Sequence, residues 1–324
     1  AAPAPVPMSA LARPAPVAAP PAAAPRAAAP PPAALSPTDI LAPTPVAPPS
    51  LGEAVAVVGD VKADAGAVLA SLAIVSETLG ANADAVAPEL PALCVAACAR
   101  LRVVFDKADD GAVCKTLLRL MLDVFCSPPL MATLNADGVR LLVTELLERL
   151  VDRRLNDGSF DGAASEGLMK SINQLMLKLL QLAPRRIALG ALIDLVAEHA
   201  PAPASAELSS LLLKCTQKLA RAVEADAATL APMPLLTKLH ALDGALRAAA
   251  DPAPAAVASA LELGKMLSEK LVKLFAADVT KALVQTEPLE PHFHAHLEGL
   301  LSQLGLGQPA AKEEEAPPPP PPPM

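Results

Sequence analysis

Residues 139–196 read VRLLVTELLERLVDRRLNDG (139–158), SFDGAASEGLMKSINQLMLKLL (159–180) and QLAPRRIALGALIDLV (181–196). In the first segment, apolar residues recur at the i, i+3, i+4 and i+7 spacing of one helix face, which we expect to be buried: Val139, Leu142, Val143, Leu146, Leu150 and Val151. The opposite face carries the polar residues Arg140, Thr144, Glu145, Glu148 and Arg149. The second segment repeats this pattern up to Pro184, which ends it because proline lacks an N–H donor. A third helix follows to about His199, so the stretch predicts amphipathic helices that must pack in series to bury their apolar faces.

The same pattern extends outward from this stretch. Gly80 is the expected C-cap of one helix, Pro128 and Pro129 break another, and Asn135 is the expected N-cap of the next. The remaining helices are predicted at about 51–58, 64–79, 88–105, from the turn at 106–111 to 126, and at 205–224, 234–249, 254–276, 278–284 and 291–304. Antiparallel hairpins would then start near residues 88, 136, 185 and 234. Their period of roughly 40 to 48 residues is typical of HEAT-like repeats and predicts an elongated α-solenoid.

Composition supports an all-α fold. Hydrophobic residues make up 53% of the 324 residues and aromatic residues only 2%, with no Trp and no Tyr. A core of Leu, Ala, Val and Met favours helices over sheets. We expect one helical domain at 51–305, a disordered Ala/Pro-rich linker at 1–50 and a disordered acidic, Pro-rich tail at 306–324. Because the chain starts without methionine, we expect it to be a segment of a longer protein.

Several classes of function are disfavoured. The formal net charge of −8 argues against nucleic-acid binding, which needs a basic surface. No apolar run reaches the roughly 18 to 20 residues of a membrane span, so we expect a cytoplasmic protein that does not bind membranes. The cysteines at 94, 98, 114, 126 and 215 lie within helical periodicity, and we expect them to be small buried apolar residues in a reducing compartment.

No pattern predicts an enzyme, a metal or a cofactor. The run Gly111 to Thr116 places Lys and Thr at the start of a helix, but Cys114 and Asp109 stand where a phosphate-binding loop needs glycine. His292 and His296 share a helix face, yet no obvious third ligand lies nearby in the sequence, so a solvated helix start is favoured over a zinc site.

Basic residues at two places are the candidate partner-binding residues. Lys214, Lys218 and Arg221 form a stripe at i, i+4 and i+7 that is either a solvated face or a docking surface for an acidic partner. The opposite, apolar side of this helix carries Leu208, Leu211, Leu212 and Cys215. The other candidates, Lys107, Arg153 and Arg154, lie in or beside predicted hairpin turns. The two arginines are equally consistent with cations that complement the helix dipole.

The run from Gly138 to Val196 also resembles a known family. The segments that carry the resemblance are Asp152-Arg153-Arg154, Ser171-Ile172-Asn173 and Ala188-Leu189-Gly190-Ala191-Leu192. They are similar to the most C-terminal TOG-like domain of the microtubule polymerase family that includes ch-TOG and Minispindles. A weaker similarity spans about 50–305 and includes Leu101-Arg102-Val103-Val104 and Ala295-His296-Leu297.

This resemblance implies a non-enzymatic interaction module at microtubules, spindle poles or the centrosome. The implied partners are tubulin or microtubules, the γ-tubulin complex and TACC-like proteins, and Arg153 and Arg154 would lie on the edge with which TOG domains grip tubulin. The family's tubulin-gripping domains also use a Trp, which this chain lacks, and the helical tail that recruits TACC proteins has no counterpart here. The alternative is a HEAT or armadillo scaffold unrelated to microtubules.

Overall fold

The computed structural model describes residues 49–107, 111–155, 162–202, 206–248, 255–284 and 290–306. Every regular element within these ranges is a helix, which confirms the all-α prediction. The predicted flanks at 1–50 and 306–324 lie almost wholly outside the described residues.

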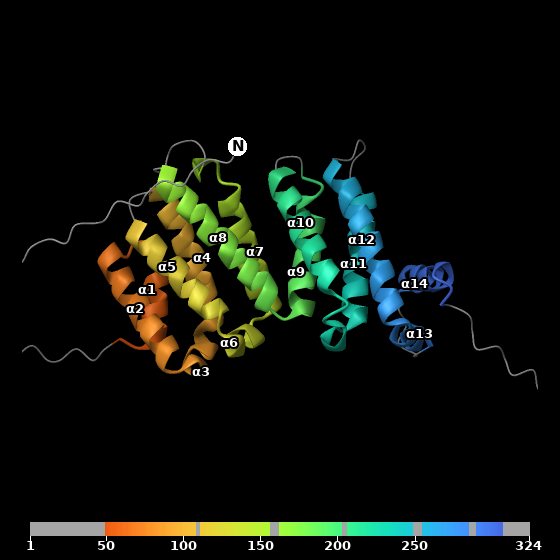
Figure 1. The fold of residues 1–324 in the computed structure, drawn as a ribbon, viewed down its shortest axis with the longest axis horizontal. Helices are drawn as coiled ribbons and strands as arrows, with labels where there is room; N and C mark the ends of the chain where they lie inside the picture. The colour runs from red at the N-terminus through yellow and green to blue at the C-terminus, as the bar shows by residue number, and fades with distance from the viewer. Residues whose placement is uncertain are drawn as a thin grey trace, which may run out of the picture. The chain divides into compact units, whose positions relative to one another are not determined.

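Successive long helices pair as hairpins (Figure 1), and the four hairpins predicted to start near residues 88, 136, 185 and 234 are preceded by one that was not predicted. These are α1 (Leu51–Gly59) with α2 (Ala65–Ala81), α4 (Leu90–Lys107) with α5 (Gly111–Phe125), α7 (Ala136–Leu150) with α8 (Gly162–Leu182), α9 (Arg185–His199) with α10 (Ala206–Ala222), and α11 (Pro232–Arg247) with α12 (Ala255–Leu274). The first helix of each hairpin packs against the first helix of the next, in the order α1, α4, α7, α9 and α11. The helical-repeat stack predicted from the period is therefore confirmed.

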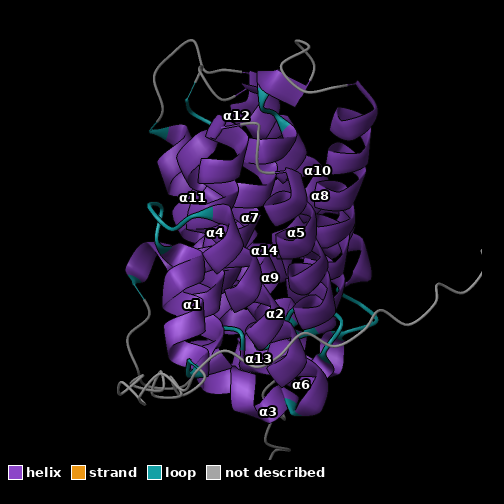
Figure 2. Cartoon of the chain, turned by 90° about the vertical axis from the view of Figure 1, so that its left-hand side faces the viewer, coloured by secondary structure: helices purple, strands orange, loops and turns teal. Residues whose placement is uncertain are grey.

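Shorter helices lie between the hairpins. α3 (Ala83–Val86), α6 (Pro128–Thr133) and α13 (Ala276–Val284) lie at the lower edge of the stack, where one hairpin connects to the next (Figures 1 and 2). α14 (Pro291–Gln303) follows α13. The sequence pattern did not predict α3 or α6. Pro128 and Pro129 do end α5, but they also start α6, because proline fits the first turn of a helix, where its missing N–H costs nothing.

The caps show why these helices begin and end where they do. Ser50 and Glu53 form a capping box at the start of α1. The Asn135 side chain accepts a hydrogen bond from the Gly138 N–H at 2.8 Å, which confirms its prediction as an N-cap. The prediction for Gly80 was wrong, because α2 continues through Gly80 to Ala81, and its C-cap is Asn82, whose side chain also caps α3.

The core is made of the predicted apolar stripes. In α7 and α8 the residues at helical spacing are almost completely buried: Val139, Leu142, Val143, Leu146, Ile172, Leu175, Met176 and Leu179. Burial of side chains of this size contributes about 1.5 to 3 kcal/mol each. Since each hairpin covers the stripe of its neighbour, the apolar core is continuous from α1 to α14.

The cysteines follow the prediction only in part. Cys94, Cys98 and Cys114 are buried, but Cys126 is exposed because it follows the last residue of α5, and Cys215 is half-buried. Burial raises the pKa of the Cys94 thiol to about 12 and that of Cys114 to about 11. These two thiols therefore stay protonated and unreactive at neutral pH.

Glu145 corrects the prediction that one face of α7 is solvated. Its side chain is completely buried, because this flank of α7 packs against α4. Arg102 belongs to α4, and its Nε donates to Glu145 Oε2 at 2.6 Å. The Nε of Arg149 lies 3.1 Å from Glu145 Oε1. Burial raises the pKa of Glu145, and the hydrogen bond from Arg102 opposes that effect. The Arg149 guanidinium also stacks over the Phe105 ring, with its central carbon 5.3 Å from the ring centroid.

Similar polar links join the other hairpins. Arg140 of α7 pairs with Glu198 of α9 at 2.5 Å, and Asp194 of α9 pairs with Lys238 of α11 at 2.5 Å. At the first junction, Arg100 of α4 donates to the Val58 carbonyl of α1 at 3.0 Å. The links are separated by 40 to 58 residues along the chain, so each one fixes the alignment of one repeat against the next.

Removal of the buried carboxylate should cost much more stability than removal of an exposed one. Glu145→Ala removes the fully buried carboxylate that Arg102 and Arg149 share, while Arg149 keeps Asp152 at 3.4 Å, so we expect a loss of about 1 to 3 kcal/mol. The matched control is Glu198→Ala, which breaks another link between consecutive hairpins, where both partners are more than 40% exposed, and should cost about 1 kcal/mol or less. Urea unfolding followed by circular dichroism measures both, and equal losses would contradict the assigned role of Glu145.

Candidate partner-binding site

The first helices of the hairpins end at the upper edge of the stack in Figure 1, where the second helices begin. Helix C-termini carry partial negative charge, and cations placed there are stabilised. Lys107 is the last residue of α4, and its side chain lies outside what the structure describes. Arg153 and Arg154 follow α7 in the short helix η2 (Arg153–Leu155).

Arg154 is bound within the fold. Its guanidinium donates to Asp152 at 2.7 Å, to Asp106 at 2.9 Å and to the Phe105 carbonyl at 2.9 Å. This network joins η2 to the end of α4, the helix that precedes it in the first layer. The hydrogen bond from Arg154 lowers the pKa of the Asp152 carboxyl. Of the two neighbouring arginines, Arg154 therefore connects two hairpins, and a partner would have to compete with two carboxylates for it.

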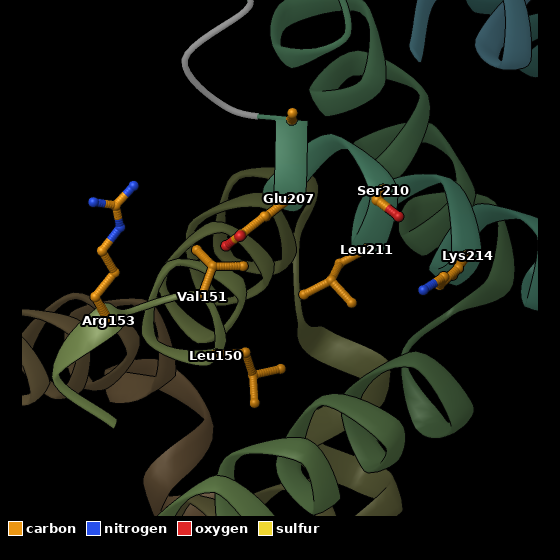
Figure 3. A pocket seen from close by; sticks show the side chains of 8 residues that line it. Leu150, Val151, Arg153, Glu207, Ser210, Leu211 and Lys214 are labelled. Atoms are coloured by element: carbon orange, nitrogen blue, oxygen red, sulfur yellow. The ribbon is translucent and has the colours of Figure 1, made fainter. Parts of the chain in front are cut away.

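Arg153 is placed differently. Its side chain is exposed, and it has no ion-pair partner among the residues that the structure describes. In Figure 3 it lies at one side of a groove whose other wall is α10, with Val151 between them. Its charge is therefore available to a partner that binds at this edge.

The groove exists because the second layer of helices opens between α8 and α10. α10 packs against α9 and reaches α7, without extensive contact to α8, and the two helices diverge towards the upper edge (Figure 1). The resulting groove has a volume of about 670 Å³. The residues that line it are Leu150, Val151, Arg153, Ala206, Glu207, Ser210, Leu211 and Lys214. The groove thus has an apolar floor, one cation from each of its two walls, and one carboxylate, that of Glu207, on the α10 side.

The basic stripe on α10 forms at the predicted spacing. Lys214, Lys218 and Arg221 are all exposed, and none pairs with an acid in the described ranges. Their helix buries Leu208, Leu212 and Leu219 on its inner side. Leu211, which was expected on the buried side, is only partly covered and lines the groove beside Lys214.

The structure therefore brings Arg153 and Lys214 together at one groove and leaves Lys218 and Arg221 farther along α10. No sequence pattern predicts the groove itself, since it depends on the angle between helices of different hairpins. The apolar residues at the end of α7, Leu150 and Val151, were expected to be core residues and are only half-buried.

The run that resembles a phosphate-binding loop and the histidines of α14 both lie within regular helices. The run from Gly111 to Thr116 forms the first turns of α5. His294 lies 3.6 Å from Glu298 within α14, and the His296 ring lies against His240 of α11 with centroids 5.4 Å apart. Burial and the neighbouring His240 lower the pKa of His296. Among the described residues no cluster of three His, Cys, Asp or Glu side chains could hold a metal ion.

No helix in the described ranges is both long enough and apolar enough to cross a bilayer.

The network around Asp152 predicts a pH-dependent contribution to stability. Because its pKa is lowered in the folded state, the carboxylate stabilises the protein above its unfolded pKa of about 4, and this contribution is lost as the pH falls below that value. Asp152→Asn should therefore lower the free energy of unfolding at pH 7 by roughly 1 to 2 kcal/mol. Between about pH 5 and pH 3 the variant should then lose less stability than the native protein does.

Asp123→Asn is the control for this experiment, because Asp123 pairs with Arg119 on an exposed helix face. Its stability curve should run parallel to that of the native protein when thermal unfolding is recorded across the same pH range. If Asp152→Asn also runs parallel, Asp152 does not have the lowered pKa that the network produces.

Comparison with known proteins finds a distant relative. The chain is 30% identical over 200 residues to Protein MOR1 of Arabidopsis thaliana, and the alignment covers 54% of this chain and 10% of that protein. The chain thus matches about a tenth of the length of this relative. No protein-family model and no solved structure matches it. The similarity agrees with the TOG-like relationship that the stretch around residues 138–196 indicates.

Proposed function

We propose that this helical domain is a non-enzymatic interaction module of a microtubule-associated protein. The observation that carries the proposal is the similarity to Protein MOR1 over 200 residues, in a chain whose helices stack as repeats. The TOG-like resemblance of residues 138–196 supports the same relationship. The module would contribute to microtubule assembly, nucleation or spindle-pole targeting in the cytoplasm by binding other proteins.

The charge distribution supports an acidic partner such as tubulin. The chain has a net charge of −8, yet α10 presents three exposed cations without acidic partners in the described structure, and Arg153 adds a fourth at the neighbouring hairpin turn. A cationic patch on an acidic protein favours one orientation in an encounter with an acidic partner. Because the chain has no Trp, binding to tubulin would rest on charge more than on an aromatic anchor.

The resemblance implies further partners. The γ-tubulin complex and TACC-like proteins would bind the same type of helical surface, and a pull-down with the full chain identifies them alongside tubulin. A scaffold unrelated to microtubules is the second candidate function. It is favoured by the short alignment with Protein MOR1, which covers only 10% of that protein.

We expect the full chain to co-sediment with microtubules, and the bound fraction to fall as the salt concentration rises, because exposed charges are screened within about 8 Å at physiological ionic strength. The triple variant Lys214→Glu, Lys218→Glu and Arg221→Glu should weaken binding roughly tenfold or more.

The matched control reverses three exposed lysines on α12 and α13: Lys265→Glu, Lys273→Glu and Lys281→Glu. Both variants change the net charge equally, so a selective loss in the first places the contact on α10. If the native chain does not sediment with microtubules at any salt concentration, and no tubulin or γ-tubulin is recovered by pull-down, the microtubule proposal is wrong and the scaffold is favoured.

A further inference from the structure

The groove between the end of α7 and the start of α10 combines an apolar floor with exposed cations. Its floor is formed by the apolar side chains of Leu150, Val151 and Leu211, which the stack leaves only half-covered (Figure 3). Arg153 stands on one wall and Lys214 on the other, and neither has an acidic partner among the described residues. An apolar floor between two exposed cations, with a single carboxylate beside them in the described ranges, favours a ligand that carries both an apolar side chain and negative charge.

We propose that this groove binds a short acidic segment of a partner protein, with one leucine-sized side chain on the apolar floor and carboxylates paired with Arg153 and Lys214. The inference deepens the proposed function, since it names the part of the surface and the kind of segment that a partner would use. The volume of about 670 Å³ lies in the range of pockets that enclose a few side chains, and is too small for a whole helical domain.

Charge complementarity selects this occupant over others. A basic or neutral segment would leave both cations without partners, and a nucleic acid would not use the leucine-lined floor. The chain's own acidic run, Glu313 to Glu315, lies between Ala, Lys and Pro residues and has no large aliphatic neighbour. This run of the chain itself therefore does not match the groove.

Among the described residues, Glu207 is the one acidic residue that lines the groove. It lies on the α10 side of the groove, above Val151 in Figure 3, and it has no cationic partner in the described ranges. Its carboxylate repels an acidic ligand, so Glu207→Gln should strengthen binding by about two- to threefold. Increased affinity on removal of one charge is an outcome that loss of folding cannot produce.

The binding test uses the full chain and a labelled peptide of about a dozen residues, glutamates with leucines at its centre, measured by fluorescence anisotropy at physiological salt. The double variant Arg153→Glu and Lys214→Glu should weaken binding roughly tenfold or more. Its matched control is Lys218→Glu and Arg221→Glu, which makes the same charge change on α10 outside the groove lining and should weaken binding by less than about threefold.

The apolar contribution is tested on the peptide, because Leu211 also packs against the core. A peptide with serines in place of the leucines should bind roughly tenfold more weakly or worse. Equal binding of the two peptides, equal loss in the two double variants, or no binding of the leucine peptide would each overturn the proposal.

The same variants separate this inference from the proposed function. If the groove variant loses the peptide but the native chain does not bind microtubules, the groove is real and its partner belongs to another system. If microtubules bind and the groove variant binds them as well as the control variant does, the groove assignment is wrong and the microtubule function stands.

Discussion

Each hairpin of this fold has an apolar face that only its neighbours can cover, and this dependence determines the rest of the structure. The helices have few aromatic residues to bury, so the core is built from many medium-sized aliphatic side chains. Such a core becomes stable by repetition, because each added hairpin buries one more interface. The continuous core from α1 to α14 is the result.

The polar links between hairpins act at the same interfaces as this packing. An aliphatic surface without aromatic residues sets the alignment of two helices weakly, because similar side chains can interdigitate in more than one register. A shift of α7 against α4 would take the buried Glu145 carboxylate away from Arg102 and leave it only Arg149 of its own helix. The exposed pair Arg140 and Glu198 can separate at little cost. The buried link therefore sets the alignment of neighbouring hairpins more strictly than the exposed link does.

The sequence was informative where structure is local. Helix positions, hairpin starts and the Asn135 cap depend on spacing within one or two turns, and these predictions are confirmed. Glu145 looked like a solvated residue because its burial comes from α4, more than forty residues earlier in the chain. The network of Arg154 with Asp106 is equally distant in sequence, so two adjacent arginines looked alike and differ in the structure.

The candidate site follows the same division. The exposed stripe of Lys214, Lys218 and Arg221 was predictable, because helical periodicity fixes which residues share a face. The groove was not, because it depends on the divergence of α8 and α10, and divergence is a property of how two hairpins pack. No residue pattern within one helix reports that angle.

The opening of the second layer also has a physical consequence for binding. The walls of the groove belong to two consecutive hairpins. Leu150 is the last residue of α7 and Arg153 follows it, whereas Leu211 and Lys214 belong to α10. Helical walls are already ordered, so a ligand that binds there pays little to organise them. A ligand that contacts both walls must also favour the arrangement in which they stand at this separation. Binding at the groove is therefore coupled to the junction between the two hairpins, where the stack of the second layer is interrupted.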